Sequence, residues 1–316
     1  MKSKIIFRLS IVILIFSLYA PSCKRDIALP KYKTKNIIII ILDGARYSEM
    51  FGDTSHQYIP NLATMAFEGT MFTNFYNDGI TNTVNGHSAL MTGYYDVLNN
   101  SGGENPKYAS FMQYWREQHH AEKNSCWVVA TKDKLEVLNN CKDVYYRNHE
   151  TPSTDCGING LGTGYREDSV TFNRAMEKLK AFHPRMMLIN FKEPDASGHA
   201  ANWNGYLQGI MKGDYYAYTI WNFLKSDAFY KDQTTLFVTN DHGRHLDGWL
   251  DGYVSHGDNC EGCRHISLLA LGPDFKKNYV ETNRYNMLDI PTTISELLGI
   301  QMPHSGGNIM TSIFQK

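Results

Sequence analysis

Each of three short apolar runs in this chain is followed by an aspartate, and two of the three aspartates are followed in turn by a histidine. The runs span 36–42, 187–191 and 235–239, and the polar residues after them are Asp43, Asp195 with His199, and Asp241 with His242. Runs of this length, rich in Ile, Leu and Val, are typical of buried parallel strands. In open α/β sheets, ligands bind beyond the carboxyl ends of such strands. We therefore expect the three clusters to meet at one sheet edge and to bind metal.

The remaining segments alternate between helical and strand-like patterns. Helices are expected over 168–182, over the aromatic-rich stretch 215–229 and over 287–298, and a later strand over 266–273. This order predicts an α/β fold, a three-layer sandwich with a mainly parallel central sheet, in one domain over 36–316. The stretch 94–166 is rich in Asn, Gly, Tyr and Lys and is expected to form loops around one strand at 126–131. Such loops either cover the site and carry substrate contacts or only lie on the surface.

The first residues have the pattern of an export signal. Basic residues precede the apolar stretch 9–18, which is too short to span a membrane, and Tyr19-Ala-Pro-Ser-Cys23 follows. Cys23 resembles a lipoprotein processing site, although Pro21 departs from the usual small residues, and an ordinary signal peptide is the alternative. We expect a signal over 1–23, a linker over 24–35, and an exported bacterial lipoprotein facing the periplasm or cell surface, attached to the membrane only through its N-terminal lipid.

Charge and cysteine content add two expectations. The formal net charge of -1 gives no sign of polyanion binding, so no nucleic acid partner is expected. Outside the cytoplasm cysteines tend to pair, and the pairings considered are Cys260 with Cys263 and Cys126 with Cys141, which leaves Cys156 free. A structural zinc site at Cys260-x-x-Cys263 is disfavoured, because no second thiol pair stands at the spacing that such sites use.

A nucleophile is expected in the segment 81–93, where hydroxyl groups lie at the start of a predicted helix. A helix N-terminus favours negative charge, and a metal ion there lowers the pKa of a coordinated hydroxyl. Local features do not separate Thr81, Thr83 and Ser88.

Four motifs in a fixed order carry a family resemblance. They are Leu42-Asp43-Gly44, Thr83 with His87 and Thr92-Gly93 behind it, Glu193-Pro-Asp195-Ala-Ser-Gly-His199, and Asn240-Asp241-His242-Gly243. From about residue 35 to its end, the sequence resembles the alkaline phosphatase superfamily, and most of all its nucleotide pyrophosphatase/phosphodiesterase branch. The resemblance implies an alkaline-phosphatase-like fold.

The same resemblance implies a site with two divalent metal ions, usually zinc in this family. One ion would be held by Asp43, Thr83, Asp241 and His242, and the other by Asp195, His199 and His256. His265 is an alternative last ligand, and His245 is a weaker one. Thr83 would be the nucleophile and form a phosphothreonine. Asn85 would donate to the phosphate, although it follows Thr83 by two residues rather than three, and a helix-capping role is its alternative.

The predicted activity is hydrolysis of a small-molecule phosphoric ester, with phosphodiesterase or nucleotide pyrophosphatase favoured. Tyr94, Tyr95 and Tyr145 would then line a slot for the second ester group. A phosphomonoesterase remains open, with Lys132 and Arg166 as phosphate clamps, although surface positions are the favoured interpretation of both. A sulfatase is disfavoured because no Cys/Ser-x-Pro-x-Arg motif surrounds Thr83. A non-catalytic surface-binding lipoprotein is the remaining alternative, and the complete ligand set argues against it.

Overall fold

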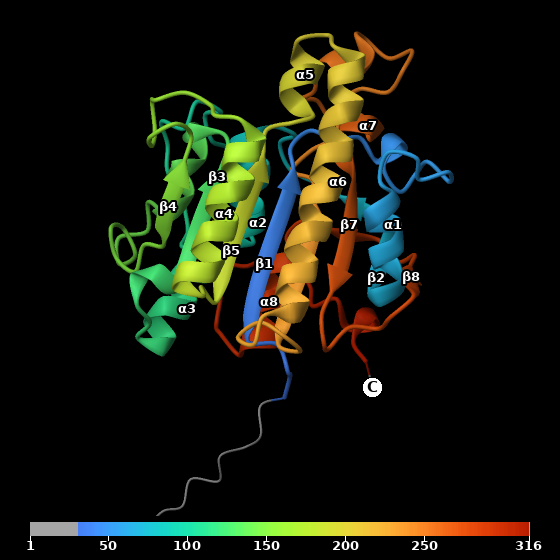
Figure 1. Cartoon of the computed structure of the whole chain (residues 1–316). Helices are drawn as coiled ribbons and strands as arrows, with labels where there is room; N and C mark the ends of the chain where they lie inside the picture. Colours follow the sequence, from blue (N-terminus) through green and yellow to red (C-terminus); the bar gives the residue numbers. More distant parts are fainter. Residues whose placement is uncertain (1–30, 316) are drawn as a thin grey trace, which may run out of the picture. The chain divides into compact units, whose positions relative to one another are not determined.

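The computed structural model describes residues 31–315, in which a single β-sheet lies between two layers of helices (Figure 1). The strands run in the order β4-β3-β5-β1-β6-β7-β2-β8, with β9 paired to β2. Their bounds are β1 (Asn36–Leu42), β2 (Thr70–Tyr76), β3 (Cys126–Ala130), β4 (Ser153–Cys156), β5 (Met186–Phe191), β6 (Thr234–Thr239), β7 (His265–Leu271), β8 (Tyr279–Glu281) and β9 (Tyr285–Asn286). The helices are α1 (Pro60–Met65), α2 (Thr83–Thr92), α3 (Phe111–His119), α4 (Asp168–Phe182), α5 (Asp195–His199), α6 (Trp203–Ser226), α7 (Glu261–Arg264) and α8 (Asp289–Leu298).

The sheet is mainly parallel, as predicted. Strands β4, β3, β5, β1 and β6 all run in the same direction. Strand β7 is antiparallel to both of its neighbours, β6 and β2. The runs at 36–42, 187–191 and 235–239 therefore become β1, β5 and β6, which lie side by side with their carboxyl ends at one edge.

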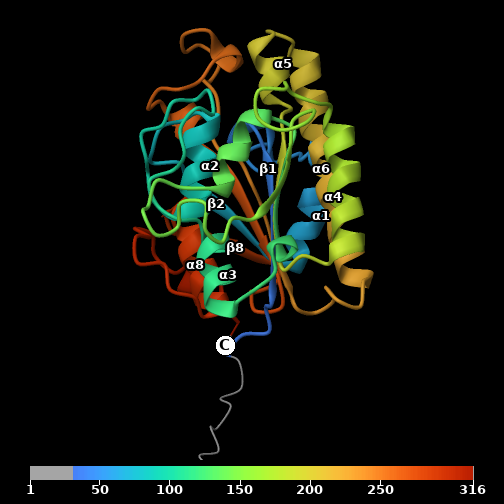
Figure 2. The same cartoon turned by 90° about the vertical axis from the view of Figure 1, so that its left-hand side faces the viewer.

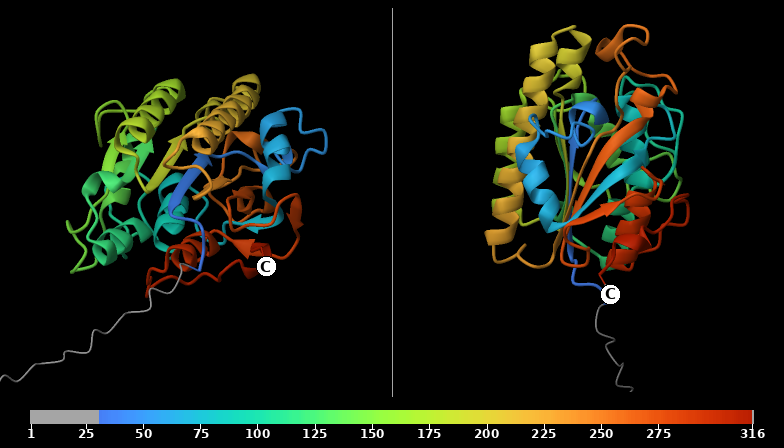
Figure 3. Two further views of the ribbon diagram at one scale, coloured as in Figure 1. Left: turned by 60° about the horizontal axis from the view of Figure 1, so that its bottom comes forward. Right: turned by 90° about the vertical axis from the view of Figure 1, so that its right-hand side faces the viewer.

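Alternate residues of β1 face two separate cores, which makes the fold a three-layer sandwich. Ile37, Ile39 and Ile41 pack with residues of α2, α3 and α8 on one side of the sheet. On the other side, Ile38 and Ile40 pack with residues of α1, α4 and α6. Figure 2 and the right-hand view of Figure 3 show the sheet nearly edge-on between these two helix layers. Every one of these isoleucines is fully buried, so the apolar run at 36–42 is explained by burial on both faces.

Two helices differ from the prediction for physical reasons. Helix α6 begins at Trp203, well before the predicted start at 215, and its first half contains Gly209 and Gly213. Glycine has low helix propensity, but here a Cβ would press on Pro194 and Leu42 respectively, so both glycines permit close packing. Helix α3 lies in the stretch expected to be loops. The sequence feature that indicates this helix is the capping box formed by Ser110 and Gln113.

The described part of the chain contains no disulfide. Cys126, Cys141, Cys156, Cys260 and Cys263 are all free thiols. The pairing of Cys126 with Cys141 is wrong, because Cys126 lies in the main core beside the sheet whereas Cys141 packs with Ala109 and Tyr114 in a separate small cluster.

Residues from Tyr32 onward form one compact unit. Between residues 31 and 315, no helix has the length and apolar character needed to cross a bilayer. The expected signal and lipoprotein site over 1–23 lie outside the described residues.

Candidate active site

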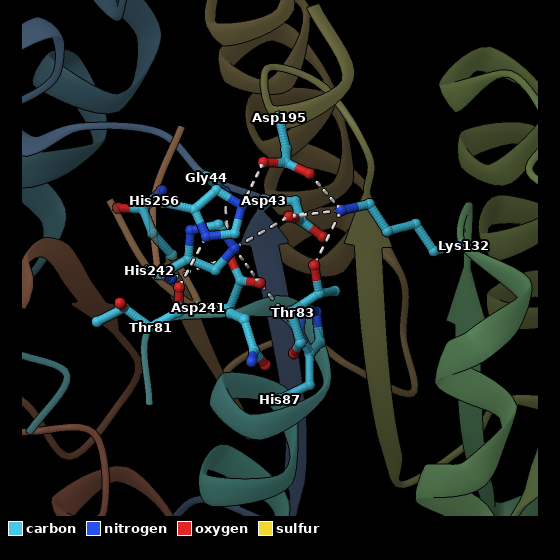
Figure 4. Close-up of polar contacts among 12 residues, drawn as sticks. Asp43, Gly44, Thr81, Thr83, His87, Lys132, Asp195, Asp241, His242 and His256 are labelled. Carbon is cyan, nitrogen blue, oxygen red and sulfur yellow. Dashed lines mark hydrogen bonds and ion pairs between the residues drawn. The ribbon is translucent and has the colours of Figure 1, made fainter. Parts of the chain in front are cut away.

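The three predicted clusters meet at the carboxyl ends of β1, β5 and β6 (Figure 4). Asp43 follows β1, Asp241 lies just after β6, and Asp195 opens α5 after β5. Hydrogen bonds donated by backbone amides hold these three segments together. The amide of Gly44 donates to Asp241 Oδ1 at 3.1 Å, and the amide of Asp195 donates to the Asp43 carbonyl at 3.0 Å.

One ligand group consists of Asp43, Asp241 and His242, whose ligand atoms lie within 4.8 Å of one another. His242 Nε2 is 3.7 Å from Asp43 Oδ1 and 3.4 Å from Asp241 Oδ2. Asp241 Oδ2 and His242 Nε2 are both buried and have no hydrogen-bond partner. Buried polar atoms without partners are costly, so two such atoms facing each other fit a bound cation.

The protonation of His242 suits metal binding. Its Nδ1 lies 2.8 Å from the carbonyl oxygen of Gly243, and because a carbonyl only accepts, Nδ1 carries the hydrogen. Nε2 then presents its lone pair to the two carboxylates. Burial lowers the pKa of His242 to about 3, despite the opposing effect of Asp241, so the ring is neutral at physiological pH. A neutral imidazole held by a second hydrogen bond is the form that binds metal.

The second ligand group consists of Asp195, His199 and His256. His256 Nε2 lies 3.1 Å from His199 Nε2 and 3.3 Å from Asp195 Oδ1, and His199 Nε2 lies 3.4 Å from the same oxygen. His256 Nδ1 donates to the Thr81 carbonyl at 2.7 Å, which turns Nε2 towards the group. The His256 ring also stacks on His242 with centroids 3.8 Å apart, so the two groups are adjacent.

The alternative last ligands lie elsewhere. His265 stacks between Tyr47 and Tyr76, with ring centroids 3.9 and 4.7 Å away. His245 faces Asp251 and Asp258 rather than Asp195. The structure therefore brings His256 into the second ligand group and leaves the other two histidines outside it.

Among the candidate hydroxyl groups, that of Thr83 lies beside the carboxylates. Thr83 is the first residue of α2, and its Oγ1 accepts a hydrogen bond of 3.1 Å from Lys132 Nζ. The hydroxyl of Thr81 instead donates to the Asp258 carbonyl. Asn85 Nδ2 donates to the Leu98 carbonyl and to Asn82 Oδ1, and Asn85 Oδ1 accepts from the Leu98 amide, so these hydrogen bonds occupy the amide that was expected to contact phosphate.

Lys132 is the largest departure from the sequence interpretation. Its expected surface position is wrong, since the residue is only 2 % exposed. Besides Thr83, its Nζ donates to Asp43 Oδ1 at 2.8 Å and to Asp195 Oδ2 at 2.6 Å (Figure 4). Burial alone would lower the pKa of Lys132, but the neighbouring carboxylates outweigh burial, and the pKa of Lys132 is raised. Lys132 comes just after β3, at the same sheet edge as the ligand carboxylates. This position after a predicted strand is the sequence feature that could have indicated its place in the site.

The other residues proposed to contact substrate lie elsewhere. Arg166 is also buried rather than on the surface, but its guanidinium pairs with Asp155 and donates to Thr171. Tyr145 donates to Glu117 of α3, Tyr94 packs against Tyr108, and Tyr95 donates to Asn286. The aromatic ring beside Lys132 is instead that of Tyr165, whose centroid lies 5.9 Å from Nζ.

Three further residues orient the ligands. Asn190 of β5 donates to Asp43 Oδ2 at 2.9 Å, and its amide also lies 3.1 Å from His87 Nε2. His87 Nδ1 donates to the Thr83 carbonyl at 2.8 Å. The fully buried Arg244 donates to Asp195 Oδ1. Of these, only His87 belonged to a motif noted in the sequence.

Comparisons with known proteins agree with this fold. A protein in the alkaline phosphatase superfamily from Vibrio parahaemolyticus superposes with a TM-score of 0.65 at 18% identity, over 88% of this chain and 70% of that chain. The phosphonate monoester hydrolase SpPMH from Silicibacter pomeroyi gives 0.66 at 12% identity, over 88% and 76%. Murine ectonucleotide pyrophosphatase/phosphodiesterase 5 gives 0.62 at 15% identity, over 89% and 100%.

Sequence comparisons add a relative and a family. A 2,3-bisphosphoglycerate-independent phosphoglycerate mutase from Gracilaria tenuistipitata var. liui is 28% identical over 128 residues, which cover 40% of this chain and 23% of the mutase. The family model described as sulfatase matches residues 35–300. The chain therefore belongs to the sulfatase family and has the fold of the alkaline phosphatase superfamily, whose members use divalent metal ions to hydrolyse phosphate or sulfate esters.

Proposed function

We propose that the protein is a metal-dependent phosphoric ester hydrolase in which Thr83 is the nucleophile. The observation that supports this most is the position of Lys132 Nζ, which contacts Thr83 Oγ1, Asp43 and Asp195 together. The hydroxyl of Thr83 thus lies between the two ligand groups, where a nucleophile and its activating charges must be close.

The donor sets fit two divalent cations. Asp43, Thr83, Asp241 and His242 would hold one ion, and Asp195, His199 and His256 the other. Mixed carboxylate and imidazole ligation suits zinc. When bound, the ions supply charge that favours the ionised hydroxyl and the departing oxygen.

The residues of the chain supply the remaining chemistry. Thr83 Oγ gives up its proton to solvent and forms a bond to phosphorus as the bond from phosphorus to the ester oxygen breaks. The ester oxygen takes a proton from solvent and leaves as an alcohol. Water then attacks the phosphothreonine and restores the Thr83 hydroxyl. Lys132 Nζ, 3.1 Å from Thr83 Oγ1, is placed to donate to a phosphoryl oxygen during both steps. His87 fixes the backbone of Thr83 through the Thr83 carbonyl.

The charge of Lys132 favours a phosphomonoester over the phosphodiester expected from sequence. A monoester carries two negative charges near neutral pH and a diester one, so an additional buried cation beside the nucleophile favours the monoester. The diester is the second candidate, on two grounds. One is the motif resemblance, and the other is the shared fold with the murine phosphodiesterase.

The test compares kcat/KM for p-nitrophenyl phosphate, bis-p-nitrophenyl phosphate and p-nitrophenyl sulfate. We expect turnover of the phosphate esters, the monoester fastest, and a loss of about 10⁴-fold or more in Thr83→Ala. Ser88→Ala is the matched control, because it removes a buried hydroxyl of the same helix that has no hydrogen-bond partner. Acid quenching followed by mass spectrometry should find phosphate on Thr83.

Two results would overturn the proposal. Wild-type activity in Thr83→Ala would exclude this nucleophile, and a preference for the sulfate ester would exclude phosphate chemistry as the main activity.

A further inference from the structure

A second cluster of metal-binding side chains lies outside the proposed active site. It consists of His245, Asp258, Cys260 and Cys263, whose ligand atoms all lie within 4.8 Å of one another. The cluster shares no residue with the two ligand groups around Thr83. We infer that it is a structural zinc site that fixes the loop carrying His256.

The strongest indication of a cation site is the side chain of His245. The residue is 4 % exposed, and its Nδ1 lies 2.8 Å from Asp251 Oδ1. Because a carboxylate only accepts, Nδ1 carries a hydrogen, and Nε2, on the other side of the ring, lies 3.3 Å from Asp258 Oδ2. Nε2 is buried and has no hydrogen-bond partner. A buried ring nitrogen without a partner that faces a carboxylate oxygen and two thiols fits a cation bound between them.

The arrangement around His245 is the one that metal-bound histidines adopt. A ligating imidazole usually donates its other ring N–H to a carboxylate, which fixes the orientation of the ring. Asp251 has this role here, and Ser255 Oγ in turn donates to Asp251 Oδ1 at 2.7 Å. The orientation of His245 is therefore already set for a ligand on Nε2.

The two cysteines identify the metal. Cys260 precedes α7 and Cys263 lies within it, so one short helical turn presents both thiols on the same side. Asp258 approaches them, since its Oδ1 accepts from the Cys260 amide at 3.0 Å. Two thiolates, one imidazole and one carboxylate make a four-ligand set that suits zinc, whereas calcium and magnesium bind through oxygen. The sequence disfavoured zinc because it offered no second thiol pair, but the fold supplies His245 and Asp258 in its place.

The position of the cluster gives it a role. Its ligands enclose the segment 246–257, which carries His256. The Asp258 carbonyl accepts from Thr81 Oγ1 at 2.7 Å, and His256 Nδ1 donates to the Thr81 carbonyl. A zinc ion joining His245 to the C-x-x-C turn would hold both ends of this segment and so hold His256 against its partners.

The test counts metal and thiols in the intact chain. Metal is measured by inductively coupled plasma mass spectrometry after gel filtration, in the wild type, in Cys260→Ser/Cys263→Ser and in the more conservative Asp258→Asn. We expect each variant to contain at least one zinc fewer per chain than the wild type. Cobalt substitution should give a thiolate-to-cobalt charge-transfer band that Cys260→Ser/Cys263→Ser lacks. Cys156→Ala is the matched control, because it removes a thiol far from the cluster and should keep both signals.

A further readout separates this site from the proposed active site. Asp241→Asn should lower the metal content without removing the charge-transfer band, because Asp241 belongs to the other ligand set. Limited proteolysis within 246–252 should accelerate in Asp258→Asn but not in Cys156→Ala. The inference is overturned if the wild type and both cluster variants contain equal zinc, or if mass spectrometry of the untreated protein finds Cys260 and Cys263 joined in a disulfide. Neither outcome depends on whether Thr83 acts on phosphate esters.

Discussion

Replacement of Lys132 by methionine tests the charge balance of the active site directly. Lys132 Nζ contacts the carboxylates of Asp43 and Asp195 at 2.8 and 2.6 Å in a site where all three side chains are at most 5 % exposed. Methionine nearly conserves the length of the side chain, so the main loss is that of charge. Leaving buried charges without their partner costs about 3–5 kcal/mol. We therefore expect metal-free Lys132→Met to lose about 4 kcal/mol of unfolding free energy.

Added zinc should reverse most of this loss, because bound cations neutralise the same carboxylates. The assay is urea unfolding followed by tryptophan fluorescence, with excess chelator or with zinc. For a urea m-value of about 3 kcal/mol/M, the metal-free midpoint should fall by about 1 M relative to wild type. With zinc, the kcat/KM for the monoester should still fall about 10²–10³-fold, since a donor beside the nucleophile is lost.

Lys134→Met is the matched control for this experiment. Lys134 lies two residues further along the same segment and donates to Asn100 Oδ1 at 3.2 Å, with no carboxylate partner. Its replacement should change stability by less than about 1 kcal/mol with or without zinc. If Lys132→Met destabilised the metal-free and zinc-loaded proteins equally, or no more than Lys134→Met, Lys132 would not balance the ligand carboxylates.

The remaining predictions concern metal, backbone packing, pH and export. Chelation should abolish esterase activity and zinc should restore it, and full activity in exhaustively chelated protein would contradict the two-ion site. Gly86→Ala should cost about 1–3 kcal/mol and lower activity, because its Cβ would press on the Asp241 backbone, whereas Gly103→Ala, which meets only Ser101 Oγ, should be nearly neutral in unfolding assays. Burial would raise the pKa of Asp155, but the ion pairs with Lys178 and Arg166 outweigh burial and lower this pKa. The ionised Asp155 therefore stabilises the fold above about pH 4, and this stabilisation is lost as the pH falls through the folded-state pKa. Asp155→Asn should therefore lower the free energy of unfolding by about 3 kcal/mol at pH 7 and by much less in acid. Glu167→Gln, which removes one partner of an exposed ion pair, should not show this pH-dependent loss. A loss in Asp155→Asn that does not change with pH would refute the charge argument. Cys23→Ala should abolish labelling of the protein by palmitate in a bacterial host, and unchanged labelling would exclude lipidation at Cys23.

Much of the fold followed from the sequence because its signals are local. The run 36–42 predicts β1 with its bounds, and the apolar spacing over 168–182 predicts α4 with its bounds. The direction of β7 was not predictable in this way. Its apolar run fits a buried strand of either direction, and only its pairing with β6 and β2 makes it antiparallel.

The convergence of the predicted ligands also followed from the sequence, because strand ends determine it. The partners of those ligands did not follow. Lys132 pairs with Asp43 and Asp195, which stand 89 and 63 residues away along the chain, and Asn190 reaches Asp43 from 147 residues away. An isolated lysine in a polar stretch is usually exposed, so composition pointed to the surface. Only the carboxylates at the same sheet edge explain its burial.

The segment from Asp241 to His245 connects the proposed active site to the proposed zinc site. His242 joins one ligand group, Arg244 donates to Asp195 of the other, and His245 belongs to the cysteine cluster. Gly243, in the middle, donates its amide to the Cys263 carbonyl at 2.8 Å, and a Cβ on Gly243 would collide with the Gly262 carbonyl.

The C-x-x-C turn is therefore packed directly on the backbone beside His242, with no side chain between them to absorb a displacement. Such close packing transmits strain. Loss of zinc from the cysteine cluster should therefore displace both His242 and His256. Because both histidines belong to the ligand groups around Thr83, metal binding there should weaken as well. Gly243→Ala, which touches no ligand atom, should lower the metal content of both sites. A loss confined to one site would show that the two sites are mechanically independent.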